Sequence, residues 1–262
     1  MKELENKTAF VTGAGRGIGR AISMALANEG AQLILAGRDM RALNETAGLI
    51  AELKTGLSPL VCYLDLLDLA TIQSSVQLSL QSFGRIDILV HNSGITGKSA
   101  PLWELDEAEW DECIDTNLKA PFLLSKAVIP SMISHKSGSI VFVGSITGKR
   151  PLINRSVYAA SKLGMVGMMR TLALELARHG VKVNLISPGF VAGPRLDSVI
   201  ANVAKIEKTS PEVIAAQWLE MVPTGRFVSP EDIAQGVLFF ASNRSASTTG
   251  EDLNISGGLV MY

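Results

Sequence analysis

The chain has 262 residues, 47% of them hydrophobic, and its 24 basic and 25 acidic side chains leave a formal net charge of -1. This length and composition predict a single domain over residues 1–262 with a substantial core. The balanced charge gives no sign of a nucleic-acid partner, so we expect a small-molecule ligand. No apolar run approaches the roughly 20 residues that a membrane span requires, so no membrane association is expected.

Apolar strand-like runs alternate with helix-length amphipathic segments along the whole chain. The predicted strands are 8–13, 31–37, 60–65, 86–94, 138–145, 181–189 and 252–258. This alternation predicts an α/β fold of Rossmann type, with a doubly wound, parallel, seven-stranded sheet and helices on both faces. Gly30, Gly84 and Gly180 each stand where a helix should stop before the next strand.

The first turn, "VTGAGRGIGRA", joins the first predicted strand to the first helix and holds Gly13, Gly15, Gly17 and Gly19. Glycines let the backbone approach a ligand closely, and the N–H groups of a helix start attract phosphate. The strict G-x-G-x-x-G fingerprint is absent, because Ile18 stands where its third glycine would be. The turn therefore predicts a nucleotide phosphate site, and the alternative is a tight connection without a ligand.

The second predicted strand ends in "LAGRD", where dinucleotide folds meet the adenosine ribose. A carboxylate at this point accepts the 2′-hydroxyl of NAD, whereas an arginine accommodates the 2′-phosphate of NADP. Here Gly37 takes that position and Arg38 follows, with Arg16 of the glycine turn as a second cation. The pattern favours NADP. The alternative is that Asp39 caps the next helix or supports NAD, and that both arginines are solvated.

The stretch "SVYAASKLG" sets Tyr158 four residues before Lys162 in a helical pattern. Residues at this spacing share one helix face, so the hydroxyl and the ammonium can reach the same small volume. A nearby cation favours the phenolate, and we expect Lys162 to lower the pKa of Tyr158 toward the range useful for acid–base catalysis. Ser145, at the end of the fifth predicted strand, can stabilise negative charge on a substrate oxygen. The alternative is a surface tyrosine and lysine.

Together these motifs resemble the short-chain dehydrogenase/reductase family, and the resemblance covers nearly the whole chain. The matching marks follow the order of the family: "TGAGRGIG", Asp65, "HNSG", Asn117 in "DTNLKAPF", Ser145 in "VGSITG", the Tyr158 and Lys162 pair, "SPG" and the closing "ISGG". The departures are His91, Ser93 and Ser256, and also Gly193, which stands where a cofactor-binding threonine is usual.

The resemblance implies an NAD(P)-dependent oxidoreductase that moves hydride between the cofactor and a carbonyl or alcohol. It implies that Tyr158 is the acid or base, Ser145 the oxyanion donor and Asn117 the holder of a water linked to Lys162. Lys162 would also hold the nicotinamide ribose. Further cofactor contacts implied in this way are Asp65, Leu66, Asn92, Gly94, Pro188, Gly189 and Val191. Each has a structural alternative, such as ending a strand or capping a helix, although Asp68 is the better cap candidate beside Asp65.

The substrate is predicted less directly. Residues 190–224 lack strand signals and include "IEKTSPEVIAAQWLEM", a helix with a serine-proline start, so we expect a substrate-binding loop and helix there. Arg150, Arg155 and Arg195, with Lys98, suggest an anionic substrate, unless they are solvated surface residues. The resemblance also admits a 3-oxoacyl-(acyl-carrier-protein) reductase or a sugar or polyol dehydrogenase.

The sequence also bears on whether the protein is an enzyme, on its oligomeric state, on metal binding and on its location in the cell. A non-catalytic NADP-binding sensor is the alternative to an enzyme, but such a protein would be expected to lack part of the catalytic set. The resemblance implies a homotetramer. Cys62 and Cys113 lie in apolar segments without metal-ligand spacing, and His91, His135 and His179 have no ligand partners in sequence, so we expect no metal and a cytoplasmic protein.

Overall fold

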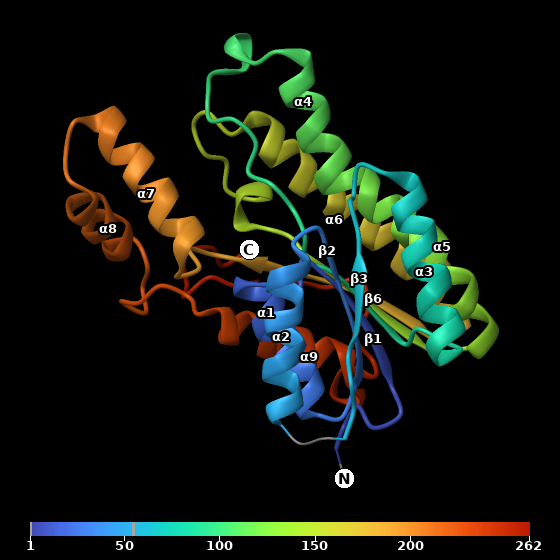
Figure 1. Cartoon of the computed structure of the whole chain (residues 1–262). Helices are drawn as coiled ribbons and strands as arrows, with labels where there is room; N and C mark the ends of the chain where they lie inside the picture. Colours follow the sequence, from blue (N-terminus) through green and yellow to red (C-terminus); the bar gives the residue numbers. More distant parts are fainter. Residues whose placement is uncertain (1, 54–55) are drawn as a thin grey trace.

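The computed structural model of the chain describes residues 2–53 and 56–262. Its strands are β1 (Thr8–Thr12), β2 (Gln32–Gly37), β3 (Leu60–Tyr63), β4 (Ile88–His91), β5 (Gly138–Val143), β6 (Val181–Pro188) and β7 (Asp252–Ile255). In the described residues they form one parallel seven-stranded sheet in the order β3-β2-β1-β4-β5-β6-β7 (Figure 1). The predicted fold class is therefore confirmed.

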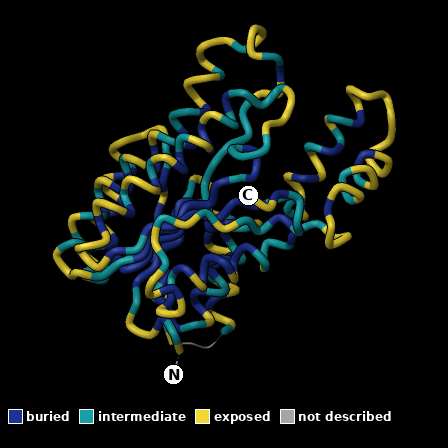
Figure 2. The backbone as a smooth tube through the Cα atoms, turned by 180° about the vertical axis from the view of Figure 1, so that it is seen from behind, coloured by how far each residue is buried: buried dark blue, intermediate teal, exposed yellow. Residues whose placement is uncertain are grey.

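Helices cover both faces of this sheet. They are α1 (Gly17–Asn28), α2 (Met40–Glu52), α3 (Leu69–Phe83), α4 (Glu107–Ile114), α5 (Ala120–His135), α6 (Ser156–Leu176), α7 (Pro194–Glu207), α8 (Pro211–Glu220) and α9 (Pro230–Ala241). Helices α1, α2 and α9 pack on one face, and α3, α5 and α6 pack on the other (Figure 1). Each face thus has its own core, with the sheet buried between them (Figure 2).

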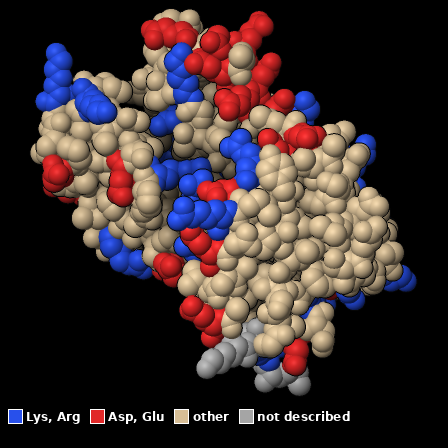
Figure 3. Space-filling view, viewed as in Figure 1, with Lys and Arg blue, Asp and Glu red and all other residues tan. Residues whose placement is uncertain are grey.

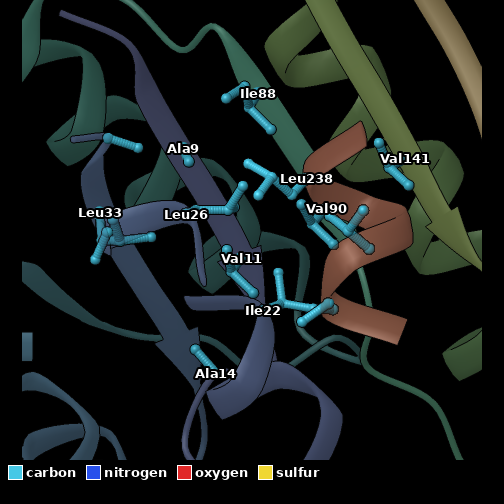
Figure 4. Packing of buried hydrophobic residues seen from close by; sticks show 14 of the residues in the cluster. Ala9, Val11, Ala14, Ile22, Leu26, Leu33, Ile88, Val90, Val141 and Leu238 are labelled. Carbon is cyan, nitrogen blue, oxygen red and sulfur yellow. The ribbon is translucent and has the colours of Figure 1, made fainter. Parts of the chain in front are cut away.

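Small and branched residues make close packing possible on the α1 and α9 face. Ala9 and Val11 of β1 lie against Ile22 and Leu26 of α1, with Leu238 of α9 beside them (Figure 4). These side chains are almost fully buried, and burying one such aliphatic side chain contributes about 1.5–3 kcal/mol. The packing fixes the start of α1 against the end of β1, which is where the glycine turn lies.

The segment after β6 forms a helix pair that stands off from the layered body (Figure 2). Helices α7 and α8 have a small core of their own, in which Phe190 stacks on Trp218 with ring centroids 4.7 Å apart. Ser210 is the N-cap of α8 and Pro211 its first residue, so the predicted serine-proline start is confirmed. Helix α7 precedes it and begins after Gly193, whose φ is 133°.

The helix stops predicted from glycine are also confirmed. Gly84 and Gly180 take left-handed φ values of 76° and 72° at the ends of their helices, and Gly30 follows α1 with φ 88°. At Gly180 an added Cβ would lie 2.4 Å from the carbonyl oxygen of Lys136, so both conformation and space require glycine there.

The strand order reverses between β1 and β4, the neighbours from which the chain runs outward in opposite directions. In open parallel sheets a ligand crevice forms outside the carboxyl ends of the strands at such a point. The predicted site residues follow β1, β3, β4, β5 and β6. No helix in the described part of the chain is both long enough and apolar enough to cross a membrane.

Candidate active site

The glycine turn is built to bring backbone close to a ligand. Gly13 and Gly17 have φ values of 65° and 52°, and a Cβ on Gly17 would meet nothing within 4 Å. Gly19 is packed instead, since a Cβ there would lie 2.1 Å from the carbonyl oxygen of Gly13. Arg16, the N-cap of α1, makes no side-chain cap hydrogen bond, so the first N–H groups of α1 are left for an anion.

Side chains distant in sequence hold this turn. Arg20 donates to the carbonyl oxygen of Gly15 at 3.0 and 2.6 Å, and Thr46 of α2 donates to the same oxygen at 3.2 Å. From β4, the Asn92 amide donates to the carbonyl oxygen of Thr12 at 2.8 Å. Sequence reasoning did not assign Arg20 or Thr46 to the site, because the glycine pattern marks neither residue; Thr12 stands in the quoted "TGAGRGIG", but its part in holding Asn92 was not predicted. It assigned Asn92 to the adenosine side, and in this structure its amide supports the glycine turn.

Two cations without an ion-pair partner in the described residues follow β1 and β2. Arg16 and Arg38 are exposed, and neither forms an ion pair within residues 2–53 and 56–262. Asp39 is the N-cap of α2 and accepts from the Ala42 N–H at 3.1 Å. Its carboxylate is therefore engaged by its own helix, as the alternative reading expected, whereas Arg38 remains available to a ligand.

The end of β3 carries Asp65 and Leu66. Asp65 accepts a hydrogen bond from the Leu67 N–H at 3.1 Å, and Leu66 is half-buried. Asp68, rather than Asp65, is the N-cap of α3 and accepts from the Ala70 N–H at 2.8 Å. Asp65 therefore shapes the turn that leads into α3 without capping the helix.

Asn117 ties three parts of the site together. It lies in a π-helical turn, Asp115–Lys119, between α4 and α5. Its side chain accepts from the Ile95 N–H at 2.8 Å and donates to the Ile95 carbonyl oxygen at 2.9 Å and to Ser161 Oγ at 3.1 Å. Ser161 in turn donates to the main-chain carbonyl of Tyr158 at 2.8 Å. Ser161 was not predicted, although it directly precedes Lys162.

Ser145, Tyr158 and Lys162 meet at the end of β5. Ser145 follows this strand and accepts from the Thr147 N–H at 3.1 Å, and it lies close enough to Tyr158 for its side chain to act to lower the pKa of the Tyr158 hydroxyl. The Lys162 ammonium is buried, donates to the carbonyl oxygen of Val143 at 3.1 Å, and lies 5.8 Å from the centroid of the Tyr158 ring. Gly94 lies beside this ammonium, since a Cβ there would be in ordinary contact with it at 3.5 Å and would lie 3.0 Å from Asn117 Oδ1.

The electrostatics differ from the sequence expectation. Burial raises the pKa of Tyr158, while the hydrogen bond from Ser145 and then the charges of Arg195 and Arg155 act to lower it. Burial, followed by repulsion from Arg195, lowers the pKa of Lys162 to about 8. The expected lowering of the Tyr158 pKa is not met here, because burial outweighs the nearby positive charges.

The residues predicted after β6 lie at the neighbouring strand end. Pro188 is the last residue of β6, and the Gly189 N–H donates to the carbonyl oxygen of Ile255 at 2.9 Å. A Cβ on Gly189 would lie 2.8 Å from the Cα of Ser256, so glycine permits close packing with the chain after β7. Val191 forms an isolated parallel β-bridge with Val228.

The predicted substrate cations separate into two groups. Arg155 donates to the carbonyl oxygen of Thr96 at 3.3 Å, and Arg195 donates to that of Gly94 at 2.7 Å, so both reach the segment after β4. Lys98 pairs with Glu109 at 2.7 Å, which offsets its charge. Arg150 is half-buried, and only its main-chain N–H is found hydrogen-bonded, to the carbonyl oxygen of Ile146 at 2.7 Å.

The doubly wound sheet, the glycine turn at its switch point and the serine, tyrosine and lysine beside it define a nucleotide-binding oxidoreductase. Comparison with known proteins refines this class. A family model described as short chain dehydrogenase matches residues 7–204. The chain belongs to the short-chain dehydrogenase/reductase family and is an oxidoreductase that acts on a carbonyl or alcohol group.

Relatives agree over almost the full length. The chain is 38% identical to the 3-oxoacyl-[acyl-carrier-protein] reductase FabG of Thermotoga maritima, covering 98% of this chain and 99% of that protein. An actinorhodin polyketide ketoreductase variant with NADPH matches with a TM-score of 0.93 and 33% identity, covering 98% of both chains. An NAD+-bound xylitol dehydrogenase matches with a TM-score of 0.93 and 29% identity, covering 98% of this chain and 100% of that one.

Proposed function

We propose that this protein transfers hydride between NADP(H) and the carbonyl or alcohol of a small substrate, with Ser145, Tyr158 and Lys162 as its catalytic residues. The observation that carries the proposal is the meeting of Ser145, Tyr158 and the buried Lys162 at the end of β5, where the Lys162 ammonium lies 5.8 Å from the centroid of the Tyr158 ring. When bound, the nicotinamide supplies or accepts the hydride.

The residues present fit such a cofactor. The open space at Gly17 and the uncapped start of α1 suit a diphosphate, because main-chain N–H groups and the helix dipole both favour negative charge there. Residues that would hold the cofactor are Gly13, Gly15, Arg16, Gly17, Ile18, Gly19, Arg38, Asp65, Leu66, Asn92, Gly94, Tyr158, Lys162, Pro188, Gly189 and Val191.

In the direction of reduction, Tyr158 is the general acid. Because burial raises the pKa of its hydroxyl, Tyr158 keeps its proton at neutral pH and can give it to the carbonyl oxygen of the substrate. Ser145 donates a hydrogen bond to the same oxygen and stabilises the negative charge that develops on it. In oxidation these proton movements are reversed, and the tyrosine oxygen accepts the proton of the alcohol.

Lys162 and Asn117 maintain this proton transfer. While it is charged, the buried Lys162 ammonium favours the phenolate that remains after Tyr158 has lost its proton. It would also donate to the nicotinamide ribose. The Asn117 side chain already bonds to Ile95 and Ser161, so we assign the water that links Lys162 to solvent to the Asn117 main-chain carbonyl, within the π-helical turn.

The charged side chains around the end of β2 favour NADP over NAD as the cofactor. Arg38 directly follows β2 and Arg16 lies in the glycine turn after β1, and both are exposed, whereas the Asp39 carboxylate is engaged as the N-cap of α2. A 2′-phosphate would thus meet guanidinium groups, and the Asp39 carboxylate, which could otherwise repel it, is held by the start of α2. The NADPH of the actinorhodin ketoreductase supports this preference, and the NAD+ of the xylitol dehydrogenase supports the alternative.

Two narrower substrate classes are compatible with this proposed function. The relatives named 3-oxoacyl-[acyl-carrier-protein] reductase support an acyl substrate, and the xylitol dehydrogenase supports a polyol. In either case α7 and α8, within residues 190–224, would cover the substrate. A non-catalytic NADP-binding sensor would not need the intact set of Asn117, Ser145, Tyr158 and Lys162.

We also propose a cytoplasmic homotetramer. Free Cys62 and Cys113 suit a reducing compartment. Apolar side chains on the outer faces of α5 and α6, and at the carboxyl end of the chain, are exposed in the isolated subunit: Phe122, Leu163, Leu174, Leu253, Met261 and Tyr262. Such exposed apolar groups are typical of contact surfaces between subunits.

The test of the proposed function is the Tyr158→Phe variant. Removing the hydroxyl should lower kcat about 10²- to 10⁴-fold, because the proton donor is lost. The dissociation constant for NADPH, measured by fluorescence titration, should stay within about threefold of wild type. Tyr63→Phe is the matched control, since Tyr63 is 50% exposed on β3, and its kcat should not change. Wild-type kcat in Tyr158→Phe would contradict the assignment.

A further inference from the structure

Two arginines from distant parts of the chain converge on one short segment after β4. Arg155 lies just before α6, and its Nη1 donates to the carbonyl oxygen of Thr96 at 3.3 Å. Arg195 lies in the first turn of α7, and its Nη2 donates to the carbonyl oxygen of Gly94 at 2.7 Å. These carbonyls are two residues apart, so the guanidinium groups are held near each other.

Both arginines lie near enough to Tyr158 to act on the pKa of its hydroxyl. Each acts to lower the pKa of Tyr158, after the larger effects of burial, which raises it, and of the Ser145 hydrogen bond. Arg195 also repels the Lys162 ammonium. Gly94, whose carbonyl accepts from Arg195, lies beside this ammonium, since a Cβ on Gly94 would lie 3.5 Å from Lys162 Nζ, so the geometry too places a positive charge next to the catalytic residues. Basic side chains likewise gather in the hollow at the centre of the face seen in Figure 3.

Neither arginine has an acidic partner in the described part of the chain, whereas Arg20, Arg41, Arg85, Arg226 and Arg244 all do. Arg155 is half-buried, and burial lowers its pKa, which reflects the cost of holding a charge away from water. Carbonyl oxygens satisfy only part of the five donors of each guanidinium group. Two incompletely paired guanidinium groups beside a catalytic hydroxyl form a site for an anion.

The surroundings restrict the charge of that anion. Six acidic residues stand on α4 and the turn before it, where red side chains gather in Figure 3: Glu104, Asp106, Glu107, Glu109, Asp111 and Glu112. Helix α4 packs against the segment after β4 whose carbonyl oxygens accept from the two arginines. A Cβ on Gly97 of this segment would lie 3.3 Å from Sγ of Cys113, which is in α4. Repulsion from the acidic residues opposes a group of high negative charge more than one of charge -1.

We propose that Arg155 and Arg195 bind the carboxylate of a small oxo acid, so that the enzyme interconverts a free oxo acid and the corresponding hydroxy acid. The inference rests on the proposed function. In reduction the carbonyl carbon gains hydride from the cofactor, the carbonyl oxygen gains the proton of Tyr158, and the carboxylate is unchanged. This class differs from both a neutral polyol and an acyl group carried as a thioester.

The test compares each acid with its neutral ester. Three-carbon to six-carbon 2-oxo and 3-oxo acids and their methyl esters are assayed with NADPH on wild type, Arg155→Gln, Arg195→Gln and Arg178→Gln. Arg178 is exposed at the far end of α6 and serves as the control. Each active-site substitution should lower kcat/KM for the preferred acid about 10- to 100-fold, because a hydrogen bond to a charged group is lost. For the ester, kcat/KM should change less than about threefold.

Cofactor and substrate binding separate this inference from its alternatives. The NADPH dissociation constant should not change in either variant, and a rise in Arg195→Gln would assign that arginine to the cofactor and overturn the proposal. Equal use of acid and ester by wild type, or an unchanged preference in both variants, would also overturn it. A phosphonate analogue of the acid should be a poorer substrate, and equal or better use of it would overturn the carboxylate assignment.

The Tyr158→Phe variant separates failure of this inference from failure of the proposed function. With NADPH bound, calorimetry should show that Tyr158→Phe still binds the oxo acid, whereas Tyr158→Phe combined with Arg195→Gln binds it at least tenfold more weakly. Retained turnover in Tyr158→Phe would refute the proposed function alone. Equal acid binding in the single and double variants would refute the arginine site alone.

Discussion

Lys162 makes the site sensitive to pH, since burial and Arg195 lower the pKa of its ammonium to about 8. Below that value it is charged and supports loss of the Tyr158 proton, and above it the support is lost. We therefore expect kcat/KM for the cofactor to be level from pH 6 to 7.5 and then to fall about tenfold per pH unit. Steady-state rates from pH 6 to 9.5 measure this. Lys162→Arg should remove the fall, because guanidinium stays protonated; a level wild-type profile to pH 9.5 would contradict the prediction.

At the same scale, we expect Arg38 to determine the choice between NADP and NAD. Arg38→Asp should weaken NADPH binding about 10- to 100-fold, because a charged hydrogen bond to the 2′-phosphate is replaced by repulsion. NADH binding should change much less, since NADH lacks that phosphate. Fluorescence titration with both cofactors measures the two dissociation constants, and Arg178→Asp is the charge-matched control. If wild type binds NADH as tightly as NADPH, the proposed NADP preference is wrong.

At the scale of single elements, the helix that carries Tyr158 and Lys162 depends on its stop signal. Gly180→Ala should lower the free energy of unfolding by about 1–3 kcal/mol, because its φ of 72° is unfavourable for alanine and the Cβ would meet the Lys136 carbonyl. Urea unfolding at one protein concentration measures this change. Gly48→Ala, within α2 where a Cβ meets nothing within 4 Å, should instead raise stability by about 0.5–1 kcal/mol. The same sign for both would contradict the explanation.

The ends of the elements also show how far sequence reasoning reached. The strand predicted over 86–94 ends at His91, and that predicted over 138–145 ends at Val143. In both cases the extra residues form the loops that carry the site, including Asn92, Gly94 and Ser145. Sequence patterns locate the ends of an element only to within a few residues, whereas the strand stops where hydrogen bonding to its neighbour stops.

At the scale of the whole molecule, the proposed tetramer accounts for apolar residues that the isolated subunit leaves in water. Leu174 of α6 is 83% exposed. We expect wild type to scatter light as four subunits at micromolar concentration, and Leu174→Glu to shift it toward smaller species by placing a charge in a contact surface.

Ile206→Glu is the control for that experiment, since Ile206 is similarly exposed, at 72%, on α7 and outside the proposed contact faces. It should leave the assembly unchanged. A wild-type protein that remains monomeric at every concentration would refute the tetramer, and an unchanged assembly in Leu174→Glu would show that α6 is not part of the contact.

The sequence by itself determined the sheet with its alternating helices, the helix stops at Gly84 and Gly180, and the place of Tyr158 and Lys162 on one face of a helix. These follow from short-range patterns, because apolar periodicity, glycine conformation and helical spacing act within a few residues. Only the tertiary structure decided that Thr46 holds the glycine turn, that Arg155 and Arg195 reach the same segment, and that burial raises the pKa of Tyr158. Those properties depend on distances between residues far apart in the chain and on the exclusion of water, which exist only once the layers have packed.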